Sequence, residues 1–298
     1  MLPENTKAII AWLKVCVIWG TTYLVIRIGV GHMPPMLFAG ILWVIAGTIF
    51  IAFLKWRGRP LPKAKDLVHL AVVGLALLGF ANGLLVFAEL WIPSGLAALV
   101  ITTVPFCMVG LESLLPKGPK LNATILTGLV MGLVGVCLIF SEDIKYLTDP
   151  HNLLGVLGLL GSVFFWSVGS LYSKYVKVDV HPLMGASVQM LIAGIFLSVI
   201  GISIGELPRL NFEIYGLLSL AYLIIMGSLV GYTSYIYVIS KLPLSLVSTY
   251  AYINPIIALF LGWIILDEKL NFQIAIAAAV IIAGVVMVKK GTAKLKNS

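Results

Sequence analysis

Apolar residues occur in long uninterrupted runs along the whole chain, separated by short polar segments. There are ten such runs, and each is long enough to cross a ~30 Å hydrocarbon core as a single helix. Within a run the apolar residues cover every side of a helix, which is typical of a membrane span and not of a half-buried soluble helix. The pattern therefore predicts an all-α polytopic membrane protein with ten transmembrane helices. The expected spans are residues 8–30, 35–54, 68–90, 92–115, 122–140, 153–174, 182–204, 214–240, 243–266 and 271–288.

Two of the runs contain a proline near the middle. Leu242–Leu266 has no charged residue, begins next to Pro243 and carries Pro255 near its centre. The fourth run has the same arrangement 150 positions earlier, with Pro93 and Pro105. A membrane helix tolerates a central proline because neighbouring helices and hydroxyl side chains bond the freed carbonyl groups. Pro105 and Pro255 are therefore expected to be helix hinges.

The correspondence extends over the chain, which consists of two copies of a five-span unit. We expect one repeat at residues 8–140 and the other at residues 153–289. Because five is an odd number, the second repeat must be inverted in the membrane relative to the first. Inverted repeats are typical of transporters, whose site lies near the midplane at the repeat interface. At an offset of 147 the matched pairs are Trp19 and Trp166, Arg27 and Lys174, Pro35 and Pro182, Ala46 and Ala193, and Gly47 and Gly194.

Glycines in the fifth span indicate close helix packing. Gly128, Gly132 and Gly135 are three or four residues apart, so they share one face of the helix. Small residues on one face let helix backbones approach closely in a membrane. Gly135 also matches Gly284 of the second repeat, at an offset of 149.

Composition and charge agree with a membrane protein. The 298 residues are 60% hydrophobic and 11% charged, far from the values of soluble domains. The net charge of +8 does not indicate nucleic acid, because sixteen of the twenty basic residues fall on the cytoplasmic side when the N-terminus is inside. This distribution follows the positive-inside rule and places both termini in the cytoplasm. Of the basic segments, Lys55–Lys65 is interpreted as a topology signal that contacts anionic lipids.

The expected location is the cell inner membrane, as a multi-pass protein. The expected partners are the lipid bilayer and a small-molecule substrate, with no nucleic acid, and the chain can act as a monomer.

No constellation of catalytic residues occurs. His32, His69, His151 and His181 fall in loops or at span ends, without a metal-binding histidine motif or a nucleophile elbow. The three cysteines lie within spans, form no C-x-x-C spacing and are interpreted as packing residues. We therefore expect no enzyme activity, no metal and no cofactor.

Glu89 and Glu112 are the acidic residues inside the predicted spans. A carboxylate in the hydrocarbon region usually faces a cavity or a partner. Glu89 lies near the outer end of the third span and Glu112 near the inner end of the fourth, so hydration at the interface is one interpretation of both. The functional interpretation of Glu89 is a gate residue or a counter-charge for a substrate ammonium group.

Polar and aromatic side chains gather near the middle of the spans. Trp19 and Tyr23 are four residues apart on one helix face, and Tyr250 and Asn254 have the same spacing. Each of these side chains alone is compatible with a hydrogen bond between helices. Together they favour a cavity for a small amphiphilic solute. The expected cavity residues are Trp19, Tyr23, Asn82, Trp166, Gln189, Tyr232, Tyr235, Tyr250 and Asn254.

A set of motifs, in register in the two repeats, resembles the EamA branch of the drug/metabolite transporter superfamily over essentially the full length. The resemblance implies a ten-helix secondary transporter, usually an exporter of small metabolites, that alternates access through a central cavity. It also favours Glu89 over Glu112 as the functional acid. The motifs are Ile18–Tyr23, the Pro-Pro-x-x-x-Ala-Gly segment at Pro34–Gly40, Phe87–Leu99, Tyr252–Pro255 and Leu266–Leu270.

Two positions depart from the family pattern. The family often has an arginine in the second span where this chain has Leu42. The first repeat also ends at Leu115–Pro119 without the acidic residue that the second repeat has at Glu268. Without a buried cation at position 42, strongly anionic solutes such as sugar phosphates are expected to be poor substrates.

These features predict a secondary transporter that exports small organic metabolites such as amino acids. A multidrug exporter for cationic aromatic compounds is the alternative within the transporter class. A non-transporting scaffold or sensor is the interpretation from a different class, and the tails of about seven residues before the first span and ten after the last argue against it.

Overall fold

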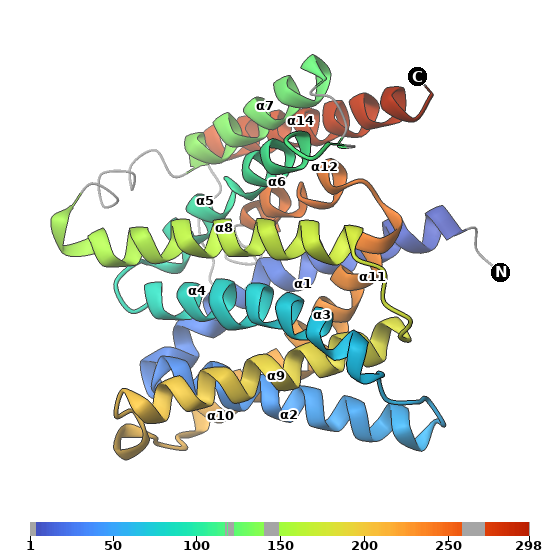
Figure 1. The fold of residues 1–298 in the computed structure, drawn as a ribbon. Coiled ribbons are helices and arrows are strands. Elements are labelled where there is room, and N and C mark those ends of the chain that lie inside the picture. The colour runs from blue at the N-terminus through green and yellow to red at the C-terminus, as the bar shows by residue number, and fades with distance from the viewer. Residues whose placement is uncertain (1–3, 117, 119–121, 140–148, 258–271, 298) are drawn as a thin grey trace.

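The computed structural model describes residues 4–116, 118, 122–139, 149–257 and 272–297, and these residues form a bundle of helices (Figure 1). No β-strand occurs in these ranges. The end of the predicted ninth span, the start of the tenth and the motif at Leu266–Leu270 lie outside them.

The first repeat contains five spans, of which the third and fourth are divided into shorter elements. α3, η1 and α4 follow one another without a gap, and α5 and α6 are separated by two residues. The elements are α1 (Glu4–His32), α2 (Pro35–Trp56), α3 (Ala64–Gly74), η1 (Leu75–Asn82), α4 (Gly83–Ala88), α5 (Ser94–Ile101), α6 (Val104–Ser113) and α7 (Ala123–Ile139).

The second repeat has the same order of elements. Its third span is again divided into three continuous parts, and its fourth span begins with a short helix. The elements are η3 (Pro150–Asn152), α8 (Leu153–Tyr175), α9 (Pro182–Ser203), η4 (Leu207–Arg209), α10 (Ile214–Tyr222), η5 (Leu223–Tyr232), α11 (Thr233–Lys241), α12 (Leu244–Val247) and α14 (Phe272–Asn297).

The predicted fold class is confirmed. Among the described residues, eight helical segments are long and apolar enough to cross a membrane, and Ala123–Ile139 and Leu244–Ile257 are shorter apolar helices. Large apolar side chains such as Val17, Leu24 and Val199 are about half exposed on the outside of the bundle. An outer surface of this kind suits lipid, because lipid tails are as apolar as these side chains.

Equivalent helices of the two repeats pack against each other in opposite directions. A Cβ atom on Gly47 of α2 would lie 2.8 Å from the Ser187 carbonyl oxygen of α9, and one on Gly194 would lie 2.9 Å from the Gly40 carbonyl oxygen. Since Ser187 and Gly194 match Gly40 and Gly47 at the offset of 147, each contact has its counterpart across an approximate two-fold axis. This reciprocity supports the inverted arrangement.

α7 and α14 pair in the same way on the other side of the bundle (Figure 1). A Cβ on Gly284 would lie 2.6 Å from the Gly128 carbonyl oxygen, and one on Gly135 would lie 3.0 Å from the Ala277 carbonyl oxygen. The close approach predicted from the glycines at 128, 132 and 135 is therefore confirmed. The remaining helices lie between these two pairs (Figure 1).

The third span of each repeat contains a π-helical segment, in which backbone hydrogen bonds join residues five apart. These segments are η1 and η5, and they lie at equivalent positions in the two repeats. In η5 the Ser228 hydroxyl donates to the Leu223 carbonyl at 3.0 Å, five residues earlier. Each segment ends at a residue that lines the cavity described below, Asn82 in η1 and Tyr232 in η5.

The fourth span of each repeat is interrupted at hydroxyl residues. Between α5 and α6, Thr102 and Thr103 donate to the carbonyls of Leu99 and Val100 at 2.5 and 2.7 Å. These side-chain bonds satisfy backbone groups that the turn frees from the helix ladder. Pro105 follows directly in the first turn of α6.

In the second repeat the interruption lies at Ser248 and Thr249, and the helix continues without a break over residues 250–257. Thr249 donates to the Leu246 carbonyl at 2.7 Å. Pro255 therefore lies six residues beyond the break and Pro105 only two, so the two prolines are not in equivalent local structures.

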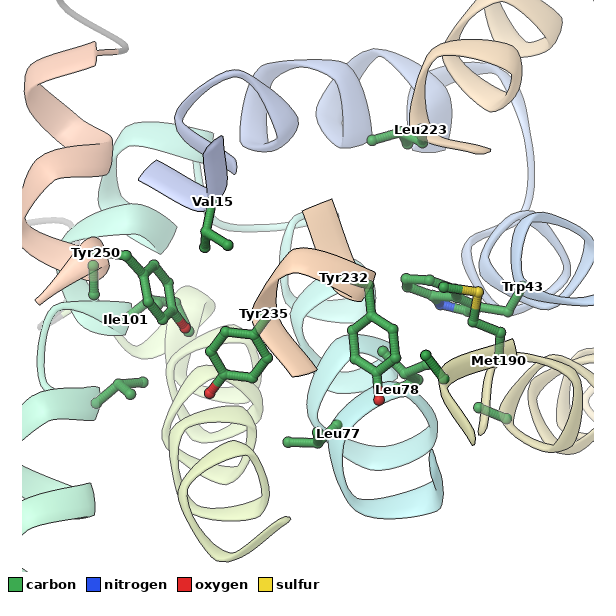
Figure 2. Packing of buried hydrophobic residues seen from close by; sticks show 14 of the residues in the cluster. Val15, Trp43, Leu77, Leu78, Ile101, Met190, Leu223, Tyr232, Tyr235 and Tyr250 are labelled. Carbon is green, nitrogen blue, oxygen red and sulfur yellow. The ribbon is translucent and has the colours of Figure 1, made fainter. Parts of the chain in front are cut away.

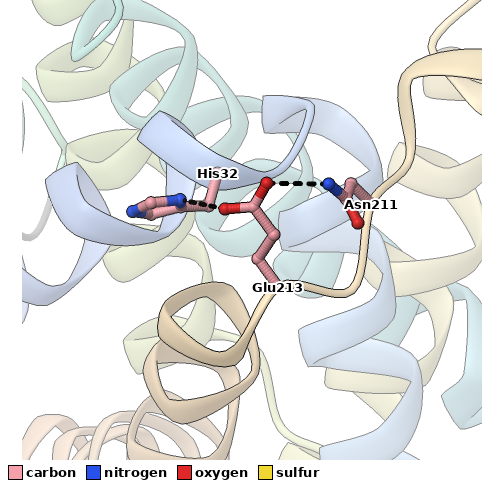
Figure 3. Close-up of polar contacts among 3 residues, drawn as sticks. All are labelled: His32, Asn211 and Glu213. Carbon is pink, nitrogen blue, oxygen red and sulfur yellow. Dashed lines mark hydrogen bonds and ion pairs between the residues drawn. The ribbon is translucent and has the colours of Figure 1, made fainter.

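Polar contacts join the two repeats at the end of the bundle where α1 ends. The Glu213 carboxylate accepts from Asn211 and is 2.8 Å from His32 Nδ1 (Figure 3). Nearby, the buried Glu206 carboxylate accepts from the backbone N–H groups of Met36 and Leu37 at 3.3 and 2.8 Å. Glu206 thereby binds the first turn of α2, where N–H groups have no partner within the helix.

Candidate functional site

A cavity of about 90 Å³ lies between the two repeats, in the middle of the bundle. Its walls come from α1, α2, η1, α4, α5, α6, α8, η5 and the helical residues around Tyr250. Among the described residues that line it, none carries a charge. The polar and aromatic lining residues are Trp19, Thr22, Tyr23, Trp43, Asn82, Ser162, Trp166, Ser228, Tyr232 and Tyr250.

Two tryptophans at equivalent positions of the repeats meet at one end of this cavity. The rings of Trp19 and Trp166 are in edge-to-face contact, with 5.3 Å between their centroids. Tyr235 and Tyr250 pack against Trp19 at 5.0 and 5.1 Å and complete an aromatic cluster. Edge-to-face packing of this kind stabilises aromatic pairs beyond the area that they bury. Because Trp19 and Trp166 are repeat equivalents in direct contact, the approximate two-fold axis passes through the cluster.

One hydrogen bond in each repeat fixes a polar group of the π-helical span. Trp43 Nε1 on α2 donates to Asn82 Oδ1 at 3.0 Å, and the Tyr232 hydroxyl donates to Gln189 Oε1 on α9 at 2.7 Å. Asn82 and Tyr232 are equivalent at the offset of 150, so both bonds join the second span of a repeat to its third. Figure 2 shows Tyr232 beside Trp43, whose ring is 5.9 Å away.

Six of the nine residues expected from the sequence line the cavity. They are Trp19, Tyr23, Asn82, Trp166, Tyr232 and Tyr250. The shared helix faces that the sequence indicated therefore converge on one space.

The other three do not line the cavity in this conformation, and each is held by hydrogen bonds to its neighbours. The Tyr235 hydroxyl is hydrogen-bonded to Ser170 at 2.7 Å, and Gln189 accepts from Tyr232. The Asn254 amide, in the orientation that satisfies both its ends, donates to the carbonyls of Tyr250 and Cys16 at 3.0 Å. These side chains position the wall residues.

Trp43 is the main lining residue that the sequence did not indicate. The repeat comparison could not reveal it, because Met190 occupies the equivalent position. A buried indole N–H needs a hydrogen-bond acceptor. The polar residue Asn82 on the third span, which accepts from Trp43, is the sequence feature that could have indicated this contact. Leu42, noted above as a departure from the family pattern, also lines the cavity and is 5% exposed.

The two acidic residues of the spans are both buried, in different surroundings. Glu112 is 4% exposed and accepts from the Tyr175 hydroxyl at 2.7 Å. Glu89 follows α4 directly, is 0% exposed, and has no hydrogen-bond partner among the described residues. Glu89 does not line the cavity, but it lies near Tyr23, which does. Both carboxyl groups are shielded from solvent in this conformation.

The arrangement can enclose a solute and cannot perform acid–base or nucleophilic chemistry on it. The cavity has broad aromatic walls and a few fixed hydrogen-bonding groups. Such walls gain about 25 cal/mol for each Å² of apolar surface that they remove from water. Amide and hydroxyl groups reduce the cost of desolvating a polar part of the solute.

Comparison with known proteins gives a consistent result for both repeats. The chain matches the EamA-like transporter family at residues 6–141 and 153–289. It is 36% identical to the "Uncharacterized inner membrane transporter YedA" of Escherichia coli (strain K12) over 280 residues, which cover 92% of this chain and 88% of that protein.

More distant similarity extends to a named efflux pump and a solved structure. The chain is 25% identical over 285 residues to the "Probable amino-acid metabolite efflux pump" of Escherichia coli (strain K12), covering 91% of each protein. A crystal structure aligns with a TM-score of 0.79 at 21% identity, covering 96% of this chain and 98% of that chain. At this identity the crystal structure shows a shared fold only.

Proposed function

Because the chain belongs to the EamA-like transporter family, we propose that it is an inner-membrane secondary transporter that exports a small neutral or zwitterionic metabolite. Amino acids with an apolar side group are the substrates that the cavity suits best. The proposal includes alternating access, in which the repeats rearrange about the approximate two-fold axis at Trp19 and Trp166. The names of two relatives, an inner membrane transporter and an amino-acid metabolite efflux pump, support it.

The single observation that carries the substrate class is the uncharged lining of the cavity. A strongly anionic solute would leave water without meeting a compensating cation, since the described lining residues, Leu42 among them, carry no charge. An apolar side group would contact Trp43, Leu42 and Phe38, and a polar end would reach Asn82 or Tyr232. A zwitterion keeps zero net charge, so its desolvation is easier to balance with dipolar groups.

The cavity size favours a small solute over a drug-sized one. The volume of the cavity is about 90 Å³. This corresponds to a small metabolite and is far below the usual volume of a site for drug-sized ligands.

A multidrug exporter for cationic aromatic compounds is the second candidate, because aromatic rings bind cations. The rings of Trp19, Trp166, Tyr235 and Tyr250 already contact one another, at centroid separations of 5.0–5.7 Å. A cation would have to separate them before it reached a ring face, which favours the metabolite exporter.

The test is counterflow in proteoliposomes with purified protein. Labelled phenylalanine and isoleucine are compared with a labelled sugar phosphate and a lipophilic aromatic cation. We expect counterflow with the amino acids and little with the sugar phosphate. Transport of the sugar phosphate or the cation in preference to the amino acids would contradict the proposed substrate class.

Variants of the cavity wall test where the substrate binds. Trp166→Ala removes a ring from the wall, and Asn254→Ala releases the backbone next to Tyr250, so both should lower amino-acid counterflow at least several-fold. Gly110→Ala is the matched control, because a Cβ there meets no atom within 4 Å. Wild-type counterflow in both wall variants would show that the substrate binds elsewhere.

A further inference from the structure

Glu89 differs from other buried carboxyl groups of the described residues in having no bonded partner. Neither of its oxygens is hydrogen-bonded, and its side chain is 0% exposed. Glu112 and Glu206 are also buried, but they accept from Tyr175 and from the first turn of α2, respectively. A carboxylate in an apolar environment is strongly disfavoured without a compensating charge or hydrogen bond, so such a group takes up a proton or pairs with a cation.

Among the described residues, one basic side chain lies near enough to interact electrostatically with Glu89. It is Arg27 on α1, one helical turn beyond Tyr23. In this conformation Arg27 and Glu89 form no ion pair within 4.0 Å, among the pairs that the described residues make. Tyr23, which lines the cavity, also lies near the Glu89 carboxyl group. The carboxyl group thus lies between a cation that it does not touch and the wall of the transport cavity.

Within the part of the chain that the structure describes, the other elements that pack against α4 bring no further charge to Glu89. η1 has no ionisable residue, and the half of α2 next to its start is apolar. α8 places Gly155 and Gly158 against the end of α4, and the Asp149 and His151 side chains before α8 are exposed. On α1, His32 pairs with Glu213. The ionisable groups of α8 lie at its opposite end: Tyr172, Lys174 and Tyr175.

In the second repeat, the residue equivalent to Arg27 is hydrogen-bonded to the end of a neighbouring helix. Lys174 matches Arg27, and its ammonium group donates to the carbonyls of Ile239 and Leu242 at 3.2 and 2.6 Å. Ile239 matches Glu89 at the offset of 150. Lys174 therefore binds the end of α11 at the position equivalent to Glu89. The end of α11 and the end of α4, which leads to Glu89, lie at opposite ends of the bundle (Figure 1).

We propose that Glu89 is a proton-binding site that couples transport to proton movement, and that its ionised form pairs with Arg27 in the alternate conformation. The proposal rests on the transport function proposed above. In an inverted-repeat transporter the two repeats exchange conformations during the cycle. The exchange releases Lys174 from α11 and brings Arg27 to the end of α4, where its guanidinium meets the Glu89 carboxyl.

The proton balance of this step follows from the charges. While Glu89 and Arg27 are apart, the carboxyl holds a proton taken from the side on which α1 ends. When they pair, the guanidinium replaces the proton as the compensating charge, and the proton passes to water in the cavity beside Tyr23. A cycle that takes up the proton on one side and releases it through the cavity to the other drives export of the metabolite by inward proton movement.

Uptake of labelled phenylalanine, the probe, into proteoliposomes tests the coupling. Counterflow at equal pH measures transport, and accumulation under a gradient of one pH unit, with the membrane potential clamped, measures coupling. For one proton per solute the limiting accumulation ratio is about tenfold. We expect the wild type to accumulate the probe several-fold. Glu89→Gln, which keeps the shape but holds no exchangeable proton, should retain counterflow and show a ratio near one.

Glu112→Gln is the matched control, because it removes a buried acid that already has a hydrogen-bond partner, and it should accumulate the probe like the wild type. Arg27→Gln should lower the accumulation ratio, and Arg27→Lys should restore part of it. The coupling role would be overturned if Glu89→Gln accumulated the probe as much as the wild type does. It would also be overturned if the wild type showed counterflow at equal pH but no accumulation under the pH gradient. Absence of phenylalanine counterflow in the wild type would count against the proposed substrate class instead.

Infrared spectroscopy of the purified protein tests the proton site without any substrate. The wild type at neutral pH should show the carbonyl band of a protonated carboxylic acid that is missing in Glu89→Gln and present in Glu112→Gln. Identical spectra of the wild type and Glu89→Gln would refute a proton on Glu89 in this conformation, whatever the transport assay shows.

Discussion

Replacing Gly284 by alanine tests the interface between α7 and α14. A Cβ at this position would lie 2.6 Å from the Gly128 carbonyl oxygen and 2.8 Å from the Gly132 nitrogen. Ordinary contact begins at 3.4 Å, so the shortfall to the oxygen is about 0.8 Å. Both neighbours are backbone atoms, and no side-chain rotation can relieve the contact. The helices must move apart, and overpacking of this kind costs about 1–3 kcal/mol.

The higher helix propensity of alanine partly offsets this cost. Alanine favours a helix over glycine by up to about 1 kcal/mol. We therefore expect Gly284→Ala to lose about 0.5–2 kcal/mol of unfolding free energy. The measurement is equilibrium unfolding in mixed micelles with a denaturing detergent. Gly135→Ala should lose less, because its closest neighbour is the Ile281 side chain, which can move.

Gly31→Ala is the control for helix propensity. It is also a helical glycine, in α1, and a Cβ there meets no atom within 4 Å. It should be neutral or slightly stabilising. Equal stability of Gly284→Ala and Gly31→Ala would refute the close packing of α7 against α14 and, with it, the reciprocal contact that supports the two-fold arrangement.

Three further outcomes are expected. Reporter fusions after Lys120 and after Ser298 should be cytoplasmic and one at Asp149 external, whereas an external C-terminus would overturn the inverted arrangement. Pro105→Ala and Pro255→Ala should each slow counterflow more than they change substrate binding measured by thermal shift. If both variants only lowered stability, and by the same amount, the prolines would have packing roles instead. Burial and the nearby Arg59 lower the pKa of His181, which lies just before α9, below its ordinary value of 6.5. The unfolded chain therefore takes up a proton on His181 more readily than the folded protein as the pH falls. Stability should decrease from pH 7 to pH 5 more in the wild type than in His181→Gln, as measured by thermal unfolding.

The span pattern and the repeat could be predicted from the sequence because a membrane restricts the possibilities. A run of apolar residues in lipid must form a helix, and an odd number of spans inverts the copy that follows. The cavity wall was predictable where a residue and its repeat equivalent were both distinctive, as for Trp19 and Trp166. These two residues identify the axis that the structure then shows as a direct ring contact.

Other parts of the site depend on contacts between helices that are distant in sequence. Trp43 is one apolar residue among many in α2, and only the position of Asn82 across the cavity gives it a role. Gln189 and Tyr235 do not line the cavity, and helical spacing alone could not distinguish them from the residues that do. The position of Pro255 does not predict the break at Ser248 and Thr249, where hydroxyl side chains bond the backbone carbonyls of the preceding turn.

The two π-helical segments offer these helices a way to turn without breaking. A π turn holds one more residue than an α turn, so its conversion to an α turn passes that residue to the next part of the helix. Each residue passed in this way rotates the following segment by about 100° while its backbone hydrogen bonds are kept. In the first repeat the segment that rotates is α4, which leads to Glu89, and in the second it is α11, which carries Tyr235. We therefore expect these helix ends to rotate about their own axes by a fraction of a turn with their backbone hydrogen bonds intact, and not to bend at a broken hinge.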